Sequence, residues 1–155
     1  MRTNRELESE GLRLHADHVL RVQTRMAEVL SDIARRMVVH DQSKYSDIEL
    51  PLIVGKATLN AVPYGTDEYK AALGKVEDSL VGHYFNNSHH PEHFADDGIG
   101  AMSLLDLLEM LCDWKAAGEQ NGGNIKESLR INVERYTISP ELTKVLRRTI
   151  QDLGW

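Results

Sequence analysis

The stretch LRLHADHVLRVQTRMAEVLSDIARRMVV, residues 12–39, decides the fold class. Its apolar residues recur at spacings of three and four, the period of an amphipathic α-helix. These residues are Leu12, Val19, Val22, Met26, Val29, Leu30, Ile33, Met37 and Val38. No glycine or proline interrupts the chain between Gly11 and His40. The pattern therefore predicts a protein built on helices.

Further helical patterns follow along the chain. They cover residues 66–85, 103–117, 125–136 and 139–154, with a turn at 63–66 before the first of them. Ser103 and Ser139 are common N-cap residues, and Ser103 with Asp106 resembles a capping box. Pro140 suits the first position of a helix. With no convincing pair of β-strands, the sequence predicts one all-α domain of about six helices over residues 1–155.

The amino-acid composition excludes several classes of protein for this chain. A chain of 155 residues with 41% apolar and 27% charged residues is typical of one globular domain. It has 24 acidic residues against 18 Lys and Arg, a net charge of −6 that disfavours binding to duplex nucleic acid. No apolar stretch is long enough to span a membrane, and the N-terminus does not resemble a signal peptide. The single Cys112 fits a reducing cytoplasm.

Histidines are the first chemical signal. The chain has seven, at positions His15, His18, His40, His83, His89, His90 and His93. A lone histidine is most often solvated or a simple polar neighbour. However, His40 is followed directly by Asp41 at the end of an apolar run. Imidazole nitrogen with carboxylate oxygen is a ligand pair that suits zinc, manganese, iron or another first-row divalent ion.

The spacing of two histidines bears on the path of the chain. His18 precedes His40 by 22 residues, which is ~33 Å of rise in an unbroken helix. If both bind one ion, the chain must turn between them, and Ser31 is the best candidate to cap a second helix. We therefore expect a helix to about Val29, a corner at Ser31-Asp32, and a short helix that ends at His40-Asp41. The alternative is one long helix with His18 exposed.

An acidic stripe marks the predicted helix over 103–117. Asp106, Glu109 and Asp113 are spaced at i, i+3 and i+7. Such a stripe is often a solvated face, but Asp113 lies between Cys112 and Trp114, which favour burial. Glu109 is a candidate to orient a ligating histidine, to act as a general base, or to form an ordinary salt bridge.

Together these residues resemble a known family. The order His18, His40-Asp41, Asp113 resembles the H…HD…D ligand order of HD-domain metal-dependent phosphohydrolases. Four blocks, HDQSK (40–44), NSHHPEH (87–93), EMLCDW (109–114) and NVER (132–135), resemble more closely an HD-like family of phages and bacteria with the pattern HDxSK, NPHH, EMxxDW. The resemblance covers about residues 15–150. Ser88 replaces the proline of that pattern, and Lys44 stands where many HD nucleotidases carry a glutamate.

The resemblance implies a set of metal ligands. It places His18, His40, Asp41 and Asp113 around a first ion. With Asp41 as a bridge, His83 and either His89 or His90 are candidates to hold a second. The resemblance thus implies an HD-domain-like helical fold with a first ion, and the additional histidines go beyond that minimum. Together they predict one or two divalent transition ions, with Zn, Mn, Co, Fe and Ni not distinguished. Two such ions ~3.5–4 Å apart can hold the attacking and leaving oxygens of a phosphoester. His15 and His93 are expected to be structural or exposed.

The function that follows is a metal-dependent phosphohydrolase acting on a nucleotide or another small phosphate ester. Glu109 and Lys44 are the expected catalytic residues, and Lys44 would meet a phosphate oxygen as a point charge. Lys115 and Arg135 are further candidates for substrate binding. One alternative is a non-catalytic, metal-stabilised binding protein, and another is a helical module that acts on a host or partner protein without metal. Helical surfaces such as the last helix are candidates for a homo-oligomer contact.

Overall fold

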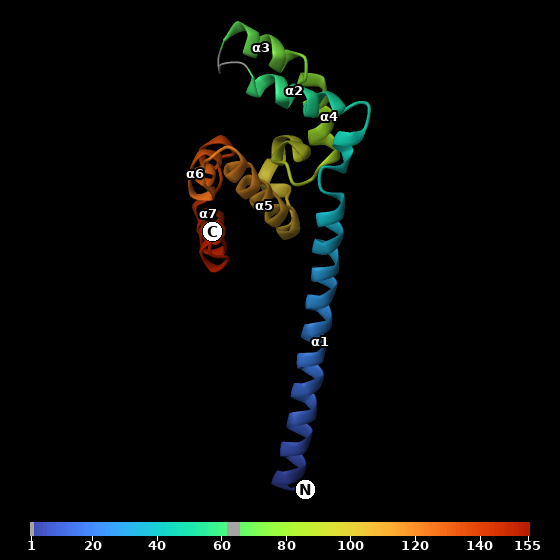
Figure 1. The fold of residues 1–155 in the computed structure, drawn as a ribbon. Helices are drawn as coiled ribbons and strands as arrows, with labels where there is room; N and C mark the ends of the chain where they lie inside the picture. The colour runs from blue at the N-terminus through green and yellow to red at the C-terminus, as the bar shows by residue number, and fades with distance from the viewer. Residues whose placement is uncertain (1, 62–65) are drawn as a thin grey trace. The chain divides into compact units, whose positions relative to one another are not determined.

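The computed structural model describes residues 2–61 and 66–155 (Figure 1). In these ranges it contains helices and no β-strand, which confirms the all-α prediction. The elements are α1 (Asn4–Val39), η1 (Gln42–Tyr45), α2 (Leu50–Asn60), α3 (Asp67–Gly74), α4 (Glu77–Asn86), η2 (Pro91–Ala101), α5 (Leu104–Gln120), α6 (Ile125–Arg135) and α7 (Pro140–Asp152), where η marks a 3-10 segment. This is more than the six helices expected. None of the helices in the described ranges has the length and apolar character needed to cross a membrane.

The chain divides into two compact units, residues 1–40 and 41–155. The first unit consists of α1, which begins with a capping box. The side chain of Thr3 accepts from the backbone N–H of Glu6, and the carboxylate of Glu6 accepts from the backbone N–H of Thr3. Two donors at the start of the helix are thereby satisfied.

The expected corner at Ser31-Asp32 is wrong, because α1 runs through both residues without a break. Asp32 does not start a new helix. Its carboxylate pairs with Arg35 at 2.7 Å and with Arg36 at 2.9 Å. Ion pairs at these spacings stabilise a continuing helix, and the segment has no glycine or proline that would end it.

The second unit has its main core between α5, α6 and α7. The buried residues of this core are Leu111, Ile125, Leu129, Ile138, Leu146 and Ile150. The N-caps predicted for α5 and α7 are confirmed, since Ser103 accepts from the backbone N–H of Asp106 and Ser139 from that of Leu142. A second buried group, Met102, Leu107 and Met110, packs against Phe94 and Ile99 of η2. The first turns of α5 are therefore held firmly, which matters for the site below.

The helix expected over 66–85 is instead two helices, α3 and α4. Val76, between them, is buried and packs on Gly55 of α2 so closely that a Cβ on that glycine would lie 2.3 Å from Val76 Cγ1. Tertiary packing at Val76 thus overrides the helical pattern. The sequence analysis did not predict α2, which has Pro51 in its first turn. Of the predicted turn at 63–66, residues 63–65 lie outside the described residues.

Candidate metal centre

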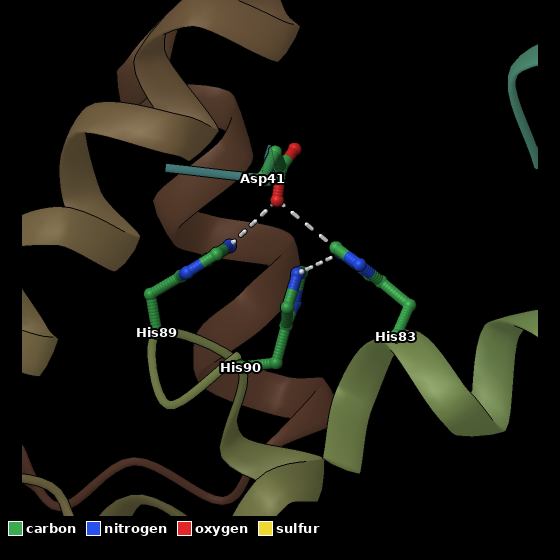
Figure 2. A group of neighbouring side chains, drawn as sticks. All are labelled: Asp41, His83, His89 and His90. Atoms are coloured by element: carbon green, nitrogen blue, oxygen red, sulfur yellow. Dashed lines mark hydrogen bonds and ion pairs between the residues drawn. The ribbon is translucent and has the colours of Figure 1, made fainter. Parts of the chain in front are cut away.

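Three imidazoles and one carboxylate converge in the second unit (Figure 2). The Nε2 atoms of His83 and His89 each lie 3.4 Å from Asp41 Oδ1, and His83 Nε2 lies 3.0 Å from His90 Nε2. One ligand atom from each of the four residues lies within 4.8 Å of the others. Ligand atoms about 2.1 Å from a tetrahedral ion are about 3.4 Å from one another. The spacing therefore fits a single divalent ion.

Local chain geometry presents these side chains from three segments. His83 lies in the last turn of α4, and His89 and His90 follow in the turn that leads to Pro91 at the start of η2. Asp41, just before η1, has left-handed backbone angles of φ 56° and ψ 14°. Such a conformation costs a non-glycine residue about 1–3 kcal/mol, and residues strained in this way cluster at functional sites. Backbone strain at Asp41 therefore points to the same site.

A buried carboxylate orients His83. Glu49 is fully buried, and its Oε2 lies 2.8 Å from His83 Nδ1. The same carboxylate accepts hydrogen bonds from Ser43 Oγ and Asn86 Nδ2, each at 2.7 Å. Because an ionised carboxylate only accepts, this contact favours the His83 tautomer with the proton on Nδ1, in which the Nε2 lone pair faces Asp41 and His90. A cation between these acceptor atoms would stabilise them, as in other carboxylate–histidine–metal sites.

Electrostatics keep the ligands in the form that binds metal. Burial lowers the pKa of His83. Burial, together with the neighbouring His89 and His83, lowers the pKa of His90 to about 3. Burial alone would raise the pKa of Glu49, but hydrogen bonds from Asn86, Ser43 and His83 outweigh it and hold the pKa below its ordinary value. At neutral pH the imidazoles of His83 and His90 are therefore neutral, as metal ligation requires. The Glu49 carboxylate, which orients His83, is charged.

Residues near the start of α5 contact His89 and the residue before it. His89 Nδ1 lies 3.2 Å from Glu109 Oε1, and Ser88 Oγ donates to Asp106 Oδ1 at 2.7 Å. Asp106 is buried and Glu109 is half-buried. At these two positions, the acidic stripe is therefore not a solvated face. The contact of Glu109 fits the role of orienting a histidine.

Of the predicted substrate-binding cations, Lys44 lies beside the centre. Its Nζ is 2.5 Å from Asp41 Oδ2, on the carboxylate oxygen that does not face the histidines. Lys115 forms an ion pair with Glu119 on its own helix. Arg135 pairs with Glu92 of η2 at 2.9 Å and lies over the ring of Tyr136. The structure thus brings Lys44, and not the other two, into contact with a candidate ligand.

The first-ion set expected from the resemblance needs correction. His18 and His40 are on one continuous helix, separated by ~33 Å of rise, so the prediction that they share an ion is wrong. His18 is exposed on α1, while His40 is the half-buried C-cap of that helix and directly precedes Asp41. Asp113 lies one turn after Glu109 on α5 and is not among the four converging residues. Only Asp41 of the expected first set belongs to that group.

The remaining histidines lie as expected. His15 is exposed on α1, and His93 is exposed with its Nδ1 3.2 Å from the backbone oxygen of Tyr84. The patterns in the sequence do not single out the three residues that support His83, which are Glu49, Asn86 and Ser43. Only Glu49 had a signal that could have revealed it. It is an acidic residue between Ile48 and Leu50 at the start of an apolar run, where a carboxylate needs a buried partner.

Comparison with protein families gives one match. The chain belongs to the family described as a family of unknown function (DUF5662), whose model matches residues 8–152. No curated protein and no solved structure matches the chain. The family description names no activity, so the function has to be argued from the chemistry of the site.

Proposed function

We propose that this protein is a metal-dependent phosphohydrolase of the HD type that acts on a nucleotide or another small phosphate ester. One observation carries the proposal. The Nε2 atoms of His83, His89 and His90 gather around Asp41, while Glu49 and Glu109 support the far nitrogens of two of them. Such a ligand set suits Zn, Mn, Fe, Co or Ni. We propose one ion held by these four residues.

Hydrolysis of a phosphate ester fits the surroundings of this centre. A divalent ion held there would polarise a phosphoryl oxygen and lower the pKa of a water molecule to make it a nucleophile. Lys44 is half-buried next to Asp41, where its ammonium group can neutralise a phosphate oxygen as a point charge. Glu109 would keep His89 in place and is a candidate to receive a proton.

A second function, a non-catalytic protein stabilised by its metal, is favoured by the ligand count. Four protein ligands complete a tetrahedral site, and complete sites are typical of structural zinc, whereas catalytic sites keep a position open. The coordination number of bound Co²⁺ separates the two. Four-coordinate Co²⁺ absorbs visible light intensely, and five- or six-coordinate Co²⁺ absorbs weakly. An open position supports the hydrolase.

Turnover provides the direct test. The purified protein is loaded in turn with Mn²⁺, Co²⁺, Ni²⁺, Zn²⁺ or Fe²⁺ and assayed on nitrophenyl phosphates and on nucleoside mono-, di- and triphosphates. We expect release of phosphate by the wild type and by His93→Gln, an exposed control, and none by Asp41→Asn. Bound metal without turnover on any substrate would favour the structural role. Failure to bind any of these metals would overturn both functions.

A further inference from the structure

Two consecutive residues of the ligand-bearing turn are held by two acidic residues of α5. Ser88 Oγ donates to Asp106 Oδ1 at 2.7 Å, and the next residue, His89, has its Nδ1 3.2 Å from Glu109 Oε1. Asp106 and Glu109 lie one helical turn apart. Near its start, α5 therefore contacts two successive residues of the turn. One of them, His89, is a candidate metal ligand, and the other, Ser88, is not.

Asp106 is itself fixed in place. Its Oδ2 accepts hydrogen bonds from the backbone N–H of Ser103 at 2.9 Å and from Ser103 Oγ at 2.7 Å. These bonds belong to the capping box of α5, and only 6% of Asp106 is exposed. The position in the first helical turn also favours its negative charge through the helix dipole. One oxygen thus belongs to the helix cap and leaves the other to bind Ser88.

We propose that the hydrogen bond from Ser88 to Asp106 positions the metal ligand His89, although neither residue reaches the ion. This inference rests on the proposed metal centre. Because Ser88 is bonded directly to His89, fixing its side chain to α5 restricts where the backbone of His89 can lie. A turn that is ordered before metal binds loses less conformational freedom on binding. Ser88 and Asp106 are therefore positioning residues.

The competing explanation is that the hydrogen bond only ties the turn to α5 for stability. Two matched variants separate the explanations. Ser88→Ala removes the bond to Asp106 and leaves the capping box intact. Ser139→Ala removes the N-cap hydroxyl of α7, which accepts from the backbone N–H of Leu142, and leaves Ser88, Asp106 and the capping box of α5 untouched. A purely structural role predicts similar effects on metal binding from both changes, in proportion to the stability each one loses.

The experiment measures Co²⁺ affinity by competition with a chelator, the visible spectrum of bound Co²⁺, and the thermal midpoint of the metal-free protein. We expect Ser88→Ala to weaken Co²⁺ binding by about 10–100-fold, as loss of other residues that support metal ligands does, and to alter the spectrum. Ser88→Thr, which keeps the hydroxyl, should restore both. Ser139→Ala should lower the midpoint with little change in affinity or spectrum.

Several results would overturn the inference. Wild-type affinity and spectrum in Ser88→Ala would show that the hydrogen bond does not position His89. Equal losses of affinity in Ser88→Ala and Ser139→Ala would show that only stability matters. If Ser88→Ala does not fold, Asp106→Asn, whose amide oxygen is an uncharged and weaker acceptor, provides a second variant in which the same bond is weakened. If the wild type itself binds no Co²⁺, the proposed metal centre fails, and the inference fails with it.

Discussion

Asp41 has a strained backbone conformation and is also a candidate metal ligand. Its φ of 56° is one that asparagine also tolerates, so Asp41→Asn keeps the shape and removes the charge. We predict a loss of metal affinity of at least ~100-fold with the helical content unchanged, because the carboxylate that faces two imidazoles is lost. Calorimetric titration with Zn²⁺ or Mn²⁺ and circular dichroism provide the measurement. Metal binding equal to that of His93→Gln would contradict the assignment.

The buried histidines predict a pH dependence of the metal-free protein. The pKa values of His83 and His90 are lowered by burial in the fold, that of His90 to about 3, whereas an unfolded histidine titrates near pH ~6.5. Between these values the unfolded chain binds more protons than the native one. The free energy of unfolding should therefore fall as the pH drops below about 6.5, by up to about 1.4 kcal/mol per pH unit for each histidine.

Urea unfolding at several pH values with EDTA present measures this dependence. The variant His90→Gln removes one of the two titrating groups and should lose its share of the slope. His93→Gln, at an exposed position, should keep the slope of the wild type. A slope unchanged in His90→Gln would show that this imidazole is not kept neutral by the fold.

Glu109 provides the third residue-level prediction. Because its carboxylate lies 3.2 Å from His89 Nδ1, Glu109→Gln weakens the charge that orients this ring. We expect about a 10-fold loss of metal affinity, with Glu119→Gln on the exposed face of the same helix as the control. If Glu109 acts instead as the general base, the variant will keep its metal and lose ~10²–10⁴-fold in rate. Unchanged affinity and unchanged rate would leave Glu109 without a role.

At the scale of elements, the continuity of α1 is open to direct measurement. Spin labels at Thr24→Cys and Val38→Cys, in a background where Cys112 is replaced by serine, span 14 residues across Ser31. A continuous helix separates the two Cα atoms by ~21 Å. Double electron–electron resonance should give a distribution centred near that value, widened by the label linkers. A markedly shorter distance would show the corner that the structure lacks.

Helix boundaries could be predicted where the signal is local. Ser103 and Ser139 cap their helices as their hydroxyls and the following residues indicate. The wrong helix boundaries lie where two interactions compete. Val76 interrupts a helical pattern because it packs on Gly55, and Asp32 continues a helix through ion pairs that compete with a cap. A single sequence does not show which competing interaction wins.

The residues of the candidate site also differ in whether the sequence alone could reveal them. Asp41 and the histidines at 83, 89 and 90 could be chosen as ligands because the residue types and their clustering are visible in the sequence. His18, His40 and Asp113 were expected around a first ion because of the family resemblance, and they are not among the four residues of this group. Glu49 supports His83 across 34 residues of chain, and no spacing in the sequence reveals such a contact.

At the scale of the whole molecule, the centre links segments that are far apart in the chain. Asp41 lies just before η1, His83 lies on α4, and the other two ligands lie in the turn before η2. An ion that binds the folded form but not the unfolded chain stabilises the fold by mass action, by about 4 kcal/mol at a free concentration 1,000 times its Kd. Metal binding should therefore be coupled to the stability of the second unit.

The most direct test of the central claim is elemental analysis of the protein after reconstitution with a divalent transition metal and removal of free ion. The four converging residues predict one ion per chain in the wild type. A variant with His83, His89 and His90 all replaced by glutamine should retain essentially none, with circular dichroism as the control for folding. Wild-type protein that holds well under one ion per chain, or a folded triple variant that still holds one, would contradict the account.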